Sequence, residues 1–323
     1  MSFSAEVKDQ LTRINTKKRC CNQVETAAFL RMSGNVLLGA GGKAGISANT
    51  TNAAIARRYY KLCKELWQLE AELLVHKNAK LKKNNIFTLR IPPQTAVQRL
   101  LDLFAQIPDG NPWSVSQKLP ADGLPAAFQG ECCRRAYLRG AFLGNGFINH
   151  PQRSYHLEMV CQDIYHAQFI MTLMSAYALQ PKINQRKGQT VVYLKESEQI
   201  SDFLNVIGAH HALLELENIR IYKDQINAAN RRANCDEANT DKVVNTGVRQ
   251  NQAIHFLQKK VGLEKLPPNL QEVAYLRLNH PETSLKELGT LADPPLSKSG
   301  MFHRLKKLEA IAEEYGYQDK TES

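Results

Sequence analysis

Cationic and hydroxyl side chains gather near the end of the 323-residue chain, in the segment SKSGMFHRLKKLEAIAEEYG. Apolar residues recur there at helical spacing, so we expect a helix that begins after Ser297 as its N-cap. The inward stripe is Met301, Leu305, Leu308 and Ile311. The cations precede the glutamates, as in a recognition helix whose N-terminal half enters the major groove of DNA. We expect base or sugar contacts from Lys298, Ser299, His303 and Arg304, and phosphate contacts from Lys306 and Lys307.

Two shorter helices are expected to hold that helix in place. The sequence NLQEVAYLRLNHPE predicts a helix ended by Pro281. Its expected inward residues are Leu270, Val273, Ala274, Leu276 and Leu278. The sequence SLKELGTLA predicts a second helix, capped by Thr283 or Ser284, with Glu287 at capping-box distance from Ser284. Gly289 comes too early to end this helix, so we expect it to let a neighbouring backbone approach.

Together these three helices predict an all-α helix-turn-helix domain over 263–316, followed by a tail, 317–323. Ser284, Lys286 and Ser297 join the expected DNA contacts because they open the second and third helices. A three-helix module that binds protein is the alternative.

An order of elements recurs in the first two thirds of the chain. The sequences TAAFLRMSG and LRGAFLGNG each indicate a helix that ends at a glycine, Gly34 or Gly146, and leads into a strand. Strand-like runs around a basic turn, and further helices, follow each junction. The period of 112 residues predicts a tandem duplication with a pseudo-twofold axis, with repeats at about 20–107 and 128–217 of a domain spanning 1–223.

A polar, Asn-rich segment, 224–262, separates this domain from the predicted helix-turn-helix. We expect a partly helical connector there, with a helix from about 244 to 261, preceded by a separate helix over 209–217. Arg231 and Arg232 are candidate phosphate contacts, and a solvated surface is the alternative.

The two helix-to-glycine segments carry a resemblance. Leu138 to Gly146, and less closely Thr26 to Gly34, resemble the LAGLIDADG motif of homing endonucleases. In that family the two helices pack together through small residues, and the eighth motif position is an acidic metal ligand. Ser33 and Asn145 stand at those positions and supply no charge to hold Mg²⁺, so we expect no nuclease activity and no catalytic residue.

Nearly the whole chain resembles the WhiA family, most specifically in the segments NRRANCDEAN, SLKELG and PPLSKSGMFHRLKKL. The resemblance implies an α+β fold of two tandem LAGLIDADG-like α/β repeats with antiparallel sheets, followed by an all-α helix-turn-helix domain. It also implies a DNA-binding regulator of cell division and chromosome segregation, a transcription regulator, with a role in sporulation in some members. Double-stranded DNA is the expected partner, and other regulatory or cell-division proteins are further candidates.

Basic turns offer a second set of candidate DNA contacts. The net charge of +11 comes entirely from residues 1–223, with 28 Lys and Arg against 17 Asp and Glu. LAGLIDADG proteins lay a saddle of strands along DNA, and the turns between the predicted strands would lie at its ends. The candidate phosphate contacts there are Lys77, Lys80, Lys82, Lys83, Arg186 and Lys187, with an ordinary solvated loop as the alternative.

The seven cysteines do not suggest special chemistry by their spacing. Cys20 and Cys21 are adjacent, as are Cys132 and Cys133, and no C-x-x-C pair occurs. We expect buried thiols in a reducing compartment, with no metal site and no cofactor. No apolar run is long enough for a membrane span, and the charged N-terminus does not resemble a signal peptide, so we expect a cytoplasmic, nucleoid-associated protein.

Two other functions remain open from the sequence. One is a residual metal-dependent endonuclease, which the LAGLIDADG resemblance suggests. The other is a protein-interaction platform, formed by the first domain and tethered to DNA by the helix-turn-helix.

Overall fold

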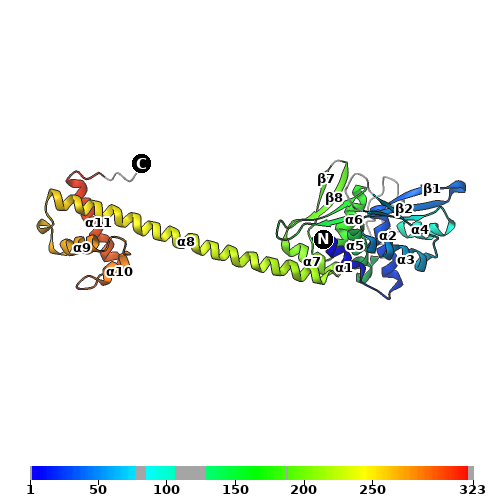
Figure 1. Cartoon of the computed structure of the whole chain (residues 1–323), viewed down its shortest axis with the longest axis horizontal. Coiled ribbons are helices and arrows are strands. Elements are labelled where there is room, and N and C mark those ends of the chain that lie inside the picture. Colours follow the sequence, from blue (N-terminus) through cyan, green and yellow to red (C-terminus); the bar gives the residue numbers. More distant parts are fainter. Residues whose placement is uncertain (1, 78–84, 106–127, 187, 319–323) are drawn as a thin grey trace. The chain divides into compact units, whose positions relative to one another are not determined.

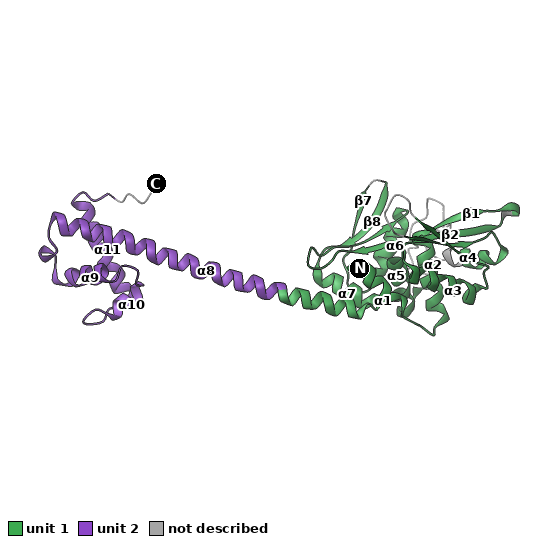
Figure 2. Cartoon of the chain, in the orientation of Figure 1, with its two compact units in different colours: residues 1–222 green, residues 223–323 purple. Residues whose placement is uncertain are grey.

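Two antiparallel sheets with equivalent strand orders lie in the first two thirds of the chain (Figure 1). The computed structural model describes residues 2–77, 85–105, 128–186 and 188–318. The chain divides into unit 1, residues 1–222, and unit 2, residues 223–323 (Figure 2).

Each repeat of unit 1 builds one four-stranded sheet, in the orders β1-β2-β4-β3 and β5-β6-β8-β7, and all neighbouring strands are antiparallel. The strands are β1 (Gly34–Leu38), β2 (Ala44–Thr50), β3 (Glu72–Lys77), β4 (Asn85–Ile91), β5 (Gly146–Ile148), β6 (Leu157–Cys161), β7 (Lys182–Arg186) and β8 (Gln189–Leu194). The expected tandem α/β repeats are confirmed. The sequence patterns did not predict β2, because its residues AGISANT are small or polar and alternate weakly.

Helices cover these sheets and form the remaining core of unit 1. They are α1 (Phe3–Thr12), α2 (Arg19–Ser33), α3 (Ala53–Trp67), α4 (Gln98–Ala105), α5 (Glu131–Asn145), α6 (Ile164–Ser175) and α7 (Ser197–Ile207). Short 3₁₀ turns lie at Ala40–Gly42 and Thr95–Val97. The predicted linker at 108–125 lies outside the described residues.

Helices α2 and α5 pack against each other at the junction of the two repeats. A methyl group added at Gly140 would overlap the Glu25 carbonyl oxygen, and one added at Gly144 would lie 2.7 Å from the Met32 Cβ. The backbones therefore approach more closely than side chains other than hydrogen permit. This is the contact through small residues that the LAGLIDADG resemblance implies.

A buried ion cluster crosses the same junction. The Glu25 carboxylate is fully buried and accepts hydrogen bonds from Arg58 Nε and Arg139 Nε, each at 2.8 Å. Arg31 of α2, 3% exposed, in turn lies 3.7 Å from the Asp163 carboxylate of the second repeat. Each repeat thus supplies a buried arginine to a carboxylate of the other.

A second buried polar pair lies in the second repeat. The Tyr137 hydroxyl is 2.8 Å from His166 Nε2, and both side chains are inaccessible to solvent. Burial, with a smaller contribution from the Arg31 charge, lowers the pKa of His166 well below 6.5. The imidazole of the folded protein is therefore neutral.

This histidine predicts a loss of stability in mild acid. Below about pH 6.5 the unfolded chain protonates His166 while the folded chain does not, so the free energy of unfolding falls as the pH decreases. The expected slope from this group approaches about 1.4 kcal/mol per pH unit. Urea unfolding between pH 7 and pH 5, followed by tryptophan fluorescence, measures it. The His166→Gln variant should show a correspondingly shallower dependence, and an equal slope in both proteins would contradict the assignment.

Helix α8 (His210–Lys260) is one continuous helix, so the prediction of two separate helices, 209–217 and 244–261, joined by a partly helical connector is wrong. Every residue from 224 to 242 is exposed, so this stretch has no apolar face for periodicity to reveal. No glycine or proline interrupts the chain between Gly208 and Gly247, so nothing stops the helix.

Unit 2 contains α8 from residue 223 onward, a 3₁₀ turn at Leu263–Lys265, and three helices, α9 (Pro268–Asn279), α10 (Leu285–Thr290) and α11 (Lys298–Glu314). Its core combines residues of all four helices, among them Leu257, Val273, Leu288 and Leu305. Among the described residues, no helix combines the length and the apolar composition that a membrane crossing requires.

Candidate nucleic-acid interface

A capping box and a close backbone contact, both predicted from the sequence, fix helix α10 in place. Ser284 and Glu287 form the expected capping box. At Gly289 an added methyl group would overlap the Leu296 carbonyl oxygen, and the Gly289 carbonyl accepts a hydrogen bond from the Leu296 backbone N–H at 2.8 Å. The predicted close backbone approach is confirmed, and it fixes α10 against the start of α11.

Helix α11 begins as expected, with the Ser297 side chain accepting a hydrogen bond from the Gly300 N–H at 3.1 Å. Met301, Leu305 and Leu308 are buried as predicted, but Ala312 completes the stripe while Ile311 is only half-buried. A helix advances 100° per residue, so position 312 lies nearer the centre of this stripe than position 311.

The opposite side of α11 exposes most of the predicted DNA contacts. A straight helix brings the exposed residues at spacings of three and four onto one face. We call this the cationic face, and it comprises Ser299, His303, Lys306 and Lys307, while the exposed Lys298 lies beside the buried stripe in the first turn. Phe302, 45% exposed, lies at its edge with its ring centroid 5.7 Å from that of His303. The apolar pattern of the sequence does not single out Phe302, and the signal is its spacing of four residues from both Lys298 and Lys306.

Arg304 does not join the cationic face. It is half-buried, its Nη1 donates to the Asn269 carbonyl oxygen at 3.4 Å, and the same nitrogen lies 3.9 Å from the Glu272 carboxylate. These contacts direct its guanidinium toward α9. Ser284 and Ser297 likewise use their hydroxyls to cap helices.

Three lysines surround a cavity of about 300 Å³ beside the start of α11. Its lining includes Lys286 and Lys298, which the sequence predicts as DNA contacts, and also Lys242 of α8, which it does not. Thr283 and Ser284 add polar groups at the start of α10. A concave site with three ammonium groups suits a phosphate.

Arg277 is a structural residue that the sequence analysis missed. It is 1% exposed, and its Nη1 lies within 3.3 Å of the carbonyl oxygens of His280, Pro281 and Thr283. The guanidinium thereby holds the turn between α9 and α10. The sequence does contain an indication of its burial, because Arg277 stands between Leu276 and Leu278 in a helix whose other inward residues are apolar.

In unit 1, the side chains at the former metal positions point to backbone. Ser33 Oγ donates to the Phe29 carbonyl at 2.7 Å, and Asn145 Nδ2 donates to the Met32 carbonyl at 3.0 Å. Both serve to fix the ends of α2 and α5. Neither brings a carboxylate to this end of the helix pair.

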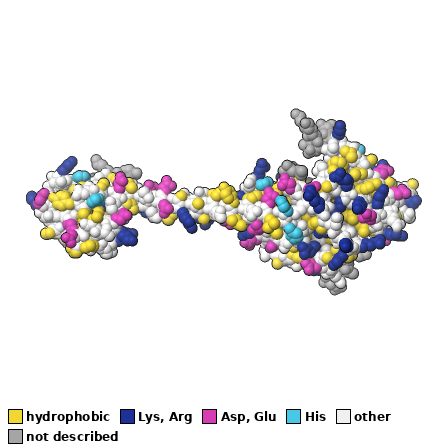
Figure 3. Space-filling model, turned by 60° about the horizontal axis from the view of Figure 1, so that its bottom comes forward, with side chains coloured by type: hydrophobic (Ala, Val, Ile, Leu, Met, Phe, Trp, Pro, Cys, Tyr) yellow, Lys and Arg dark blue, Asp and Glu magenta, His cyan; other side chains and the backbone are white. Residues whose placement is uncertain are grey.

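Of the predicted strand-end cations, Lys77 ends β3 and Arg186 ends β7, and both are exposed. Lys80, Lys82, Lys83 and Lys187 lie outside the described residues. Arg231 and Arg232 are exposed on α8. Lys and Arg side chains spread over much of the face of unit 1 in Figure 3.

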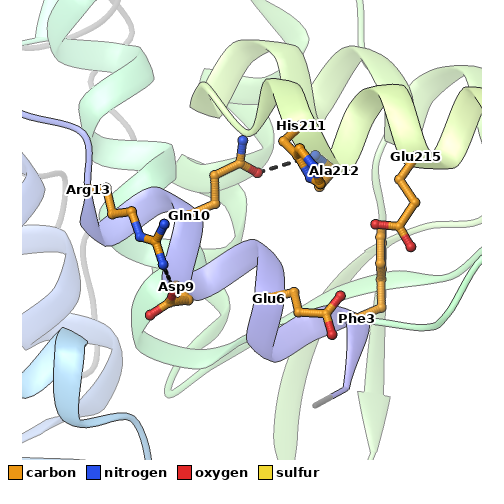
Figure 4. A pocket seen from close by; sticks show the side chains of 8 residues that line it. All are labelled: Phe3, Glu6, Asp9, Gln10, Arg13, His211, Ala212 and Glu215. Carbon is orange, nitrogen blue, oxygen red and sulfur yellow. Dashed lines mark hydrogen bonds and ion pairs between the residues drawn. The ribbon is translucent and has the colours of Figure 1, made fainter.

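One large cavity of unit 1 has the opposite charge. It lies between α1 and the start of α8, measures about 500 Å³, and is lined by the carboxylates of Glu6, Asp9 and Glu215 (Figure 4). Arg13, 2.6 Å from Asp9, neutralises only part of this charge. The excess of carboxylates disfavours phosphate binding in this cavity.

The cysteines only partly fit the expectation of buried thiols, because three of the seven are exposed or half-exposed. The sulfur atoms of Cys20, Cys21 and Cys133 lie within 4.8 Å of one another, and Cys20 and Cys235 are exposed. In the described part of the chain this is the one group of three or more His, Cys, Asp or Glu ligands close enough to share an ion.

Three family models match consecutive parts of the chain. The WhiA N-terminal LAGLIDADG-like domain matches residues 19–105, the WhiA LAGLIDADG-like domain matches 134–225, and the WhiA C-terminal HTH domain matches 229–312. The chain belongs to the WhiA family. The family's helix-turn-helix match begins on α8 and so includes the helix that the sequence analysis treated as a connector.

WhiA relatives are similar over nearly the whole length. Proteins named probable cell division protein WhiA from Desulforamulus reducens and Shouchella clausii are 44% and 46% identical, covering 97% of this chain and 96% and 94% of their own lengths. A crystal structure of full-length WhiA from Thermatoga maritima covers 98% of this chain and 100% of its own, at 26% identity and a TM-score of 0.59.

Proposed function

We propose that this WhiA-family chain is a DNA-binding regulator of cell division, and that it binds double-stranded DNA without cleaving it. The cationic face of α11 carries the proposal, because it presents His303, Lys306 and Lys307 to solvent on the side opposite the buried stripe. The relatives' name, cell division protein, supports the cellular role.

The mechanism follows from the exposure of each side chain. In this proposal Lys306 and Lys307 contact phosphates, while Lys298, Ser299 and His303, in the first two turns of α11, contact base edges or sugars, and the exposure of all five side chains supports these roles. Phosphate contacts fix the position of α11 on the duplex, and contacts to base edges select the sequence. Arg304 acts by holding α11 against α9.

We further propose that unit 1 adds phosphate contacts through Lys77 and Arg186, and that Arg231 and Arg232 of α8 do the same. These exposed cations would supply affinity that depends little on sequence. Regulation of transcription, a role in chromosome segregation and association with the nucleoid belong to the same proposal. The uncharged side chains Ser33 and Asn145 support the absence of nuclease activity.

The test is a gel-shift assay with full-length protein and a duplex pool selected by the wild-type chain. The Lys306→Ala/Lys307→Ala double variant should lose about one phosphate contact per lysine, lowering the slope of log affinity against log salt by about 2. The affinity at moderate salt should fall across all sequences in the pool.

Lys265→Ala is the matched control, since Lys265 is an exposed lysine of unit 2 outside α11, and it should bind like the wild type. An unchanged affinity and salt slope in the double variant would contradict the proposed interface. The same pool incubated with wild-type protein and Mg²⁺ should remain uncut, and nicked product would contradict the absence of nuclease activity.

A further inference from the structure

Two Cys-Cys pairs meet where α2 and α5 begin. Cys20 and Cys21 occupy the first turn of α2, and Cys132 and Cys133 occupy the first turn of α5. The sulfur atoms of Cys20, Cys21 and Cys133 lie within 4.8 Å of one another. Cys132 is the neighbour of Cys133 in the same turn of α5, and its sulfur lies 3.8 Å from the ammonium of Lys18, the N-cap residue of α2.

The cluster has the symmetry of the duplication. The period that relates Gly34 to Gly146 also relates Cys20 to Cys132 and Cys21 to Cys133. The four thiols therefore lie near the pseudo-twofold axis, at the opposite end of the α2–α5 pair from Ser33 and Asn145. A donor set contributed equally by two repeats is suited to an ion on the axis between them.

We propose that Cys20, Cys21, Cys132 and Cys133 bind one thiophilic divalent cation, Zn²⁺, that joins the two repeats. Four thiolates are a tetrahedral donor set for this ion. With Zn–S distances of about 2.3 Å, neighbouring sulfur atoms in a tetrahedron are about 3.8 Å apart, so the sulfur atoms of Cys20, Cys21 and Cys133 need to approach by no more than about 1 Å. Cys132, the half-exposed fourth ligand, would turn its sulfur toward the ion. Each thiol gives its proton to solvent as its sulfur binds the ion.

The surroundings favour the negative charge of a four-thiolate site. Both helices direct their N-terminal ends at the cluster, and neither N-cap residue, Lys18 or Gly130, caps its helix with a side chain. The Lys18 ammonium lies 3.8 Å from the Cys132 sulfur. Cys20 is exposed and Cys132 half-exposed, which leaves a path for the ion to enter, while Cys21 and Cys133 are buried.

A redox pair of thiols is the competing use of this cluster. Redox-active cysteines have thiolates stabilised at neutral pH. A redox pair needs two thiols, whereas three sulfur atoms lie within 4.8 Å of one another here and Cys132 adjoins them. A metal ion gives all four thiols a role.

The experiment measures metal in full-length protein purified under reducing conditions and loaded with zinc chloride, then freed of excess ion. We expect one zinc per chain in the wild type and loss of that zinc in Cys20→Ser and Cys132→Ser. These two positions are the accessible ones, so the changes leave the core packing intact. Cys235→Ser removes an exposed cysteine of unit 2 and should retain the zinc.

Cobalt(II) titration of the wild type gives a second readout that does not depend on any variant folding. Thiolate-to-cobalt charge-transfer bands and the strong d–d bands of a tetrahedral site should saturate at one equivalent. Weak, non-saturating bands would overturn the proposal, as would zinc retention in both serine variants. Failure of the fully reduced wild type to take up metal, together with disulfides between the Cys20–Cys21 and Cys132–Cys133 pairs in the unreduced chain, would assign the cluster to redox chemistry instead.

Discussion

Replacing Glu25 with glutamine is expected to destabilise unit 1 by about 3–5 kcal/mol, the usual cost of removing one partner from a buried ion pair. The carboxylate accepts from Arg58 and Arg139 on separate oxygens, with Nη2 distances of 2.8 and 2.7 Å. Glutamine keeps the shape but turns an NH₂ donor toward one guanidinium, which also donates. Two arginine side chains less than 10% exposed would then lack their countercharge.

Urea unfolding followed by tryptophan fluorescence measures this effect, because both tryptophans, Trp67 and Trp113, are in the sequence of unit 1. Glu65→Gln is the matched control. Its carboxylate is 3.6 Å from Lys61, but both side chains are more than half exposed, so the change should cost less than about 0.5 kcal/mol. A loss below about 1 kcal/mol in Glu25→Gln would show that the cluster is not needed for stability.

In unit 2 the largest effect is expected from Gly289→Ala. The new methyl group would overlap the Leu296 carbonyl, and backbone cannot move aside as a flexible side chain can. We expect a loss of about 1–3 kcal/mol as α10 and the start of α11 separate. Hydrogen exchange of the α11 amides in the full-length chain should accelerate by about tenfold for each 1.4 kcal/mol, and DNA affinity should fall with it.

Gly300→Ala makes the same substitution where space is available. Its added methyl would meet only Ser297 Oγ at 3.4 Å and Leu296 Cδ2 at 3.9 Å, and the Gly300 N–H would still donate to Ser297. Alanine favours the helical conformation by about 0.5–1 kcal/mol, so this variant should exchange more slowly than the wild type. Equal exchange in the two variants would mean that the contact between Gly289 and Leu296 does not hold α11.

The sequence predicts local structure correctly where a short motif determines how a helix begins or how closely two backbones approach. The capping box of Ser284 and Glu287, the cap at Ser297 and the close approach at Gly289 are confirmed because each depends on residues within a few positions. The repeat was also predictable, because Gly34 and Gly146 end equivalent helices.

Local motifs do not predict the burial of Arg277, the continuity of α8 or the thiol cluster. These features depend on contacts between residues far apart in the sequence, or on a helix surface that makes no contacts. Arg277 is buried because three carbonyls of a following turn surround its guanidinium, and helical periodicity does not describe such a site. The middle of α8 has no apolar face, so periodicity is silent there. The thiol cluster required the cysteine pairs and the repeat period to be considered together, and the spacing of the cysteines alone predicts no metal site.

The buried arginines of unit 1 make its two halves complementary rather than interchangeable. By the repeat period, Glu25 corresponds to Tyr137 and Arg139 corresponds to Ala27. Two copies of the second half, paired symmetrically, would bury two Arg139 side chains with no carboxylate between them. Two copies of the first half would offer each Glu25 only one arginine instead of two. Pairing of two identical halves, in nascent chains or by exchange between molecules, would leave buried charge uncompensated and is therefore disfavoured. The correct partner for each half is the one joined to it in the same polypeptide.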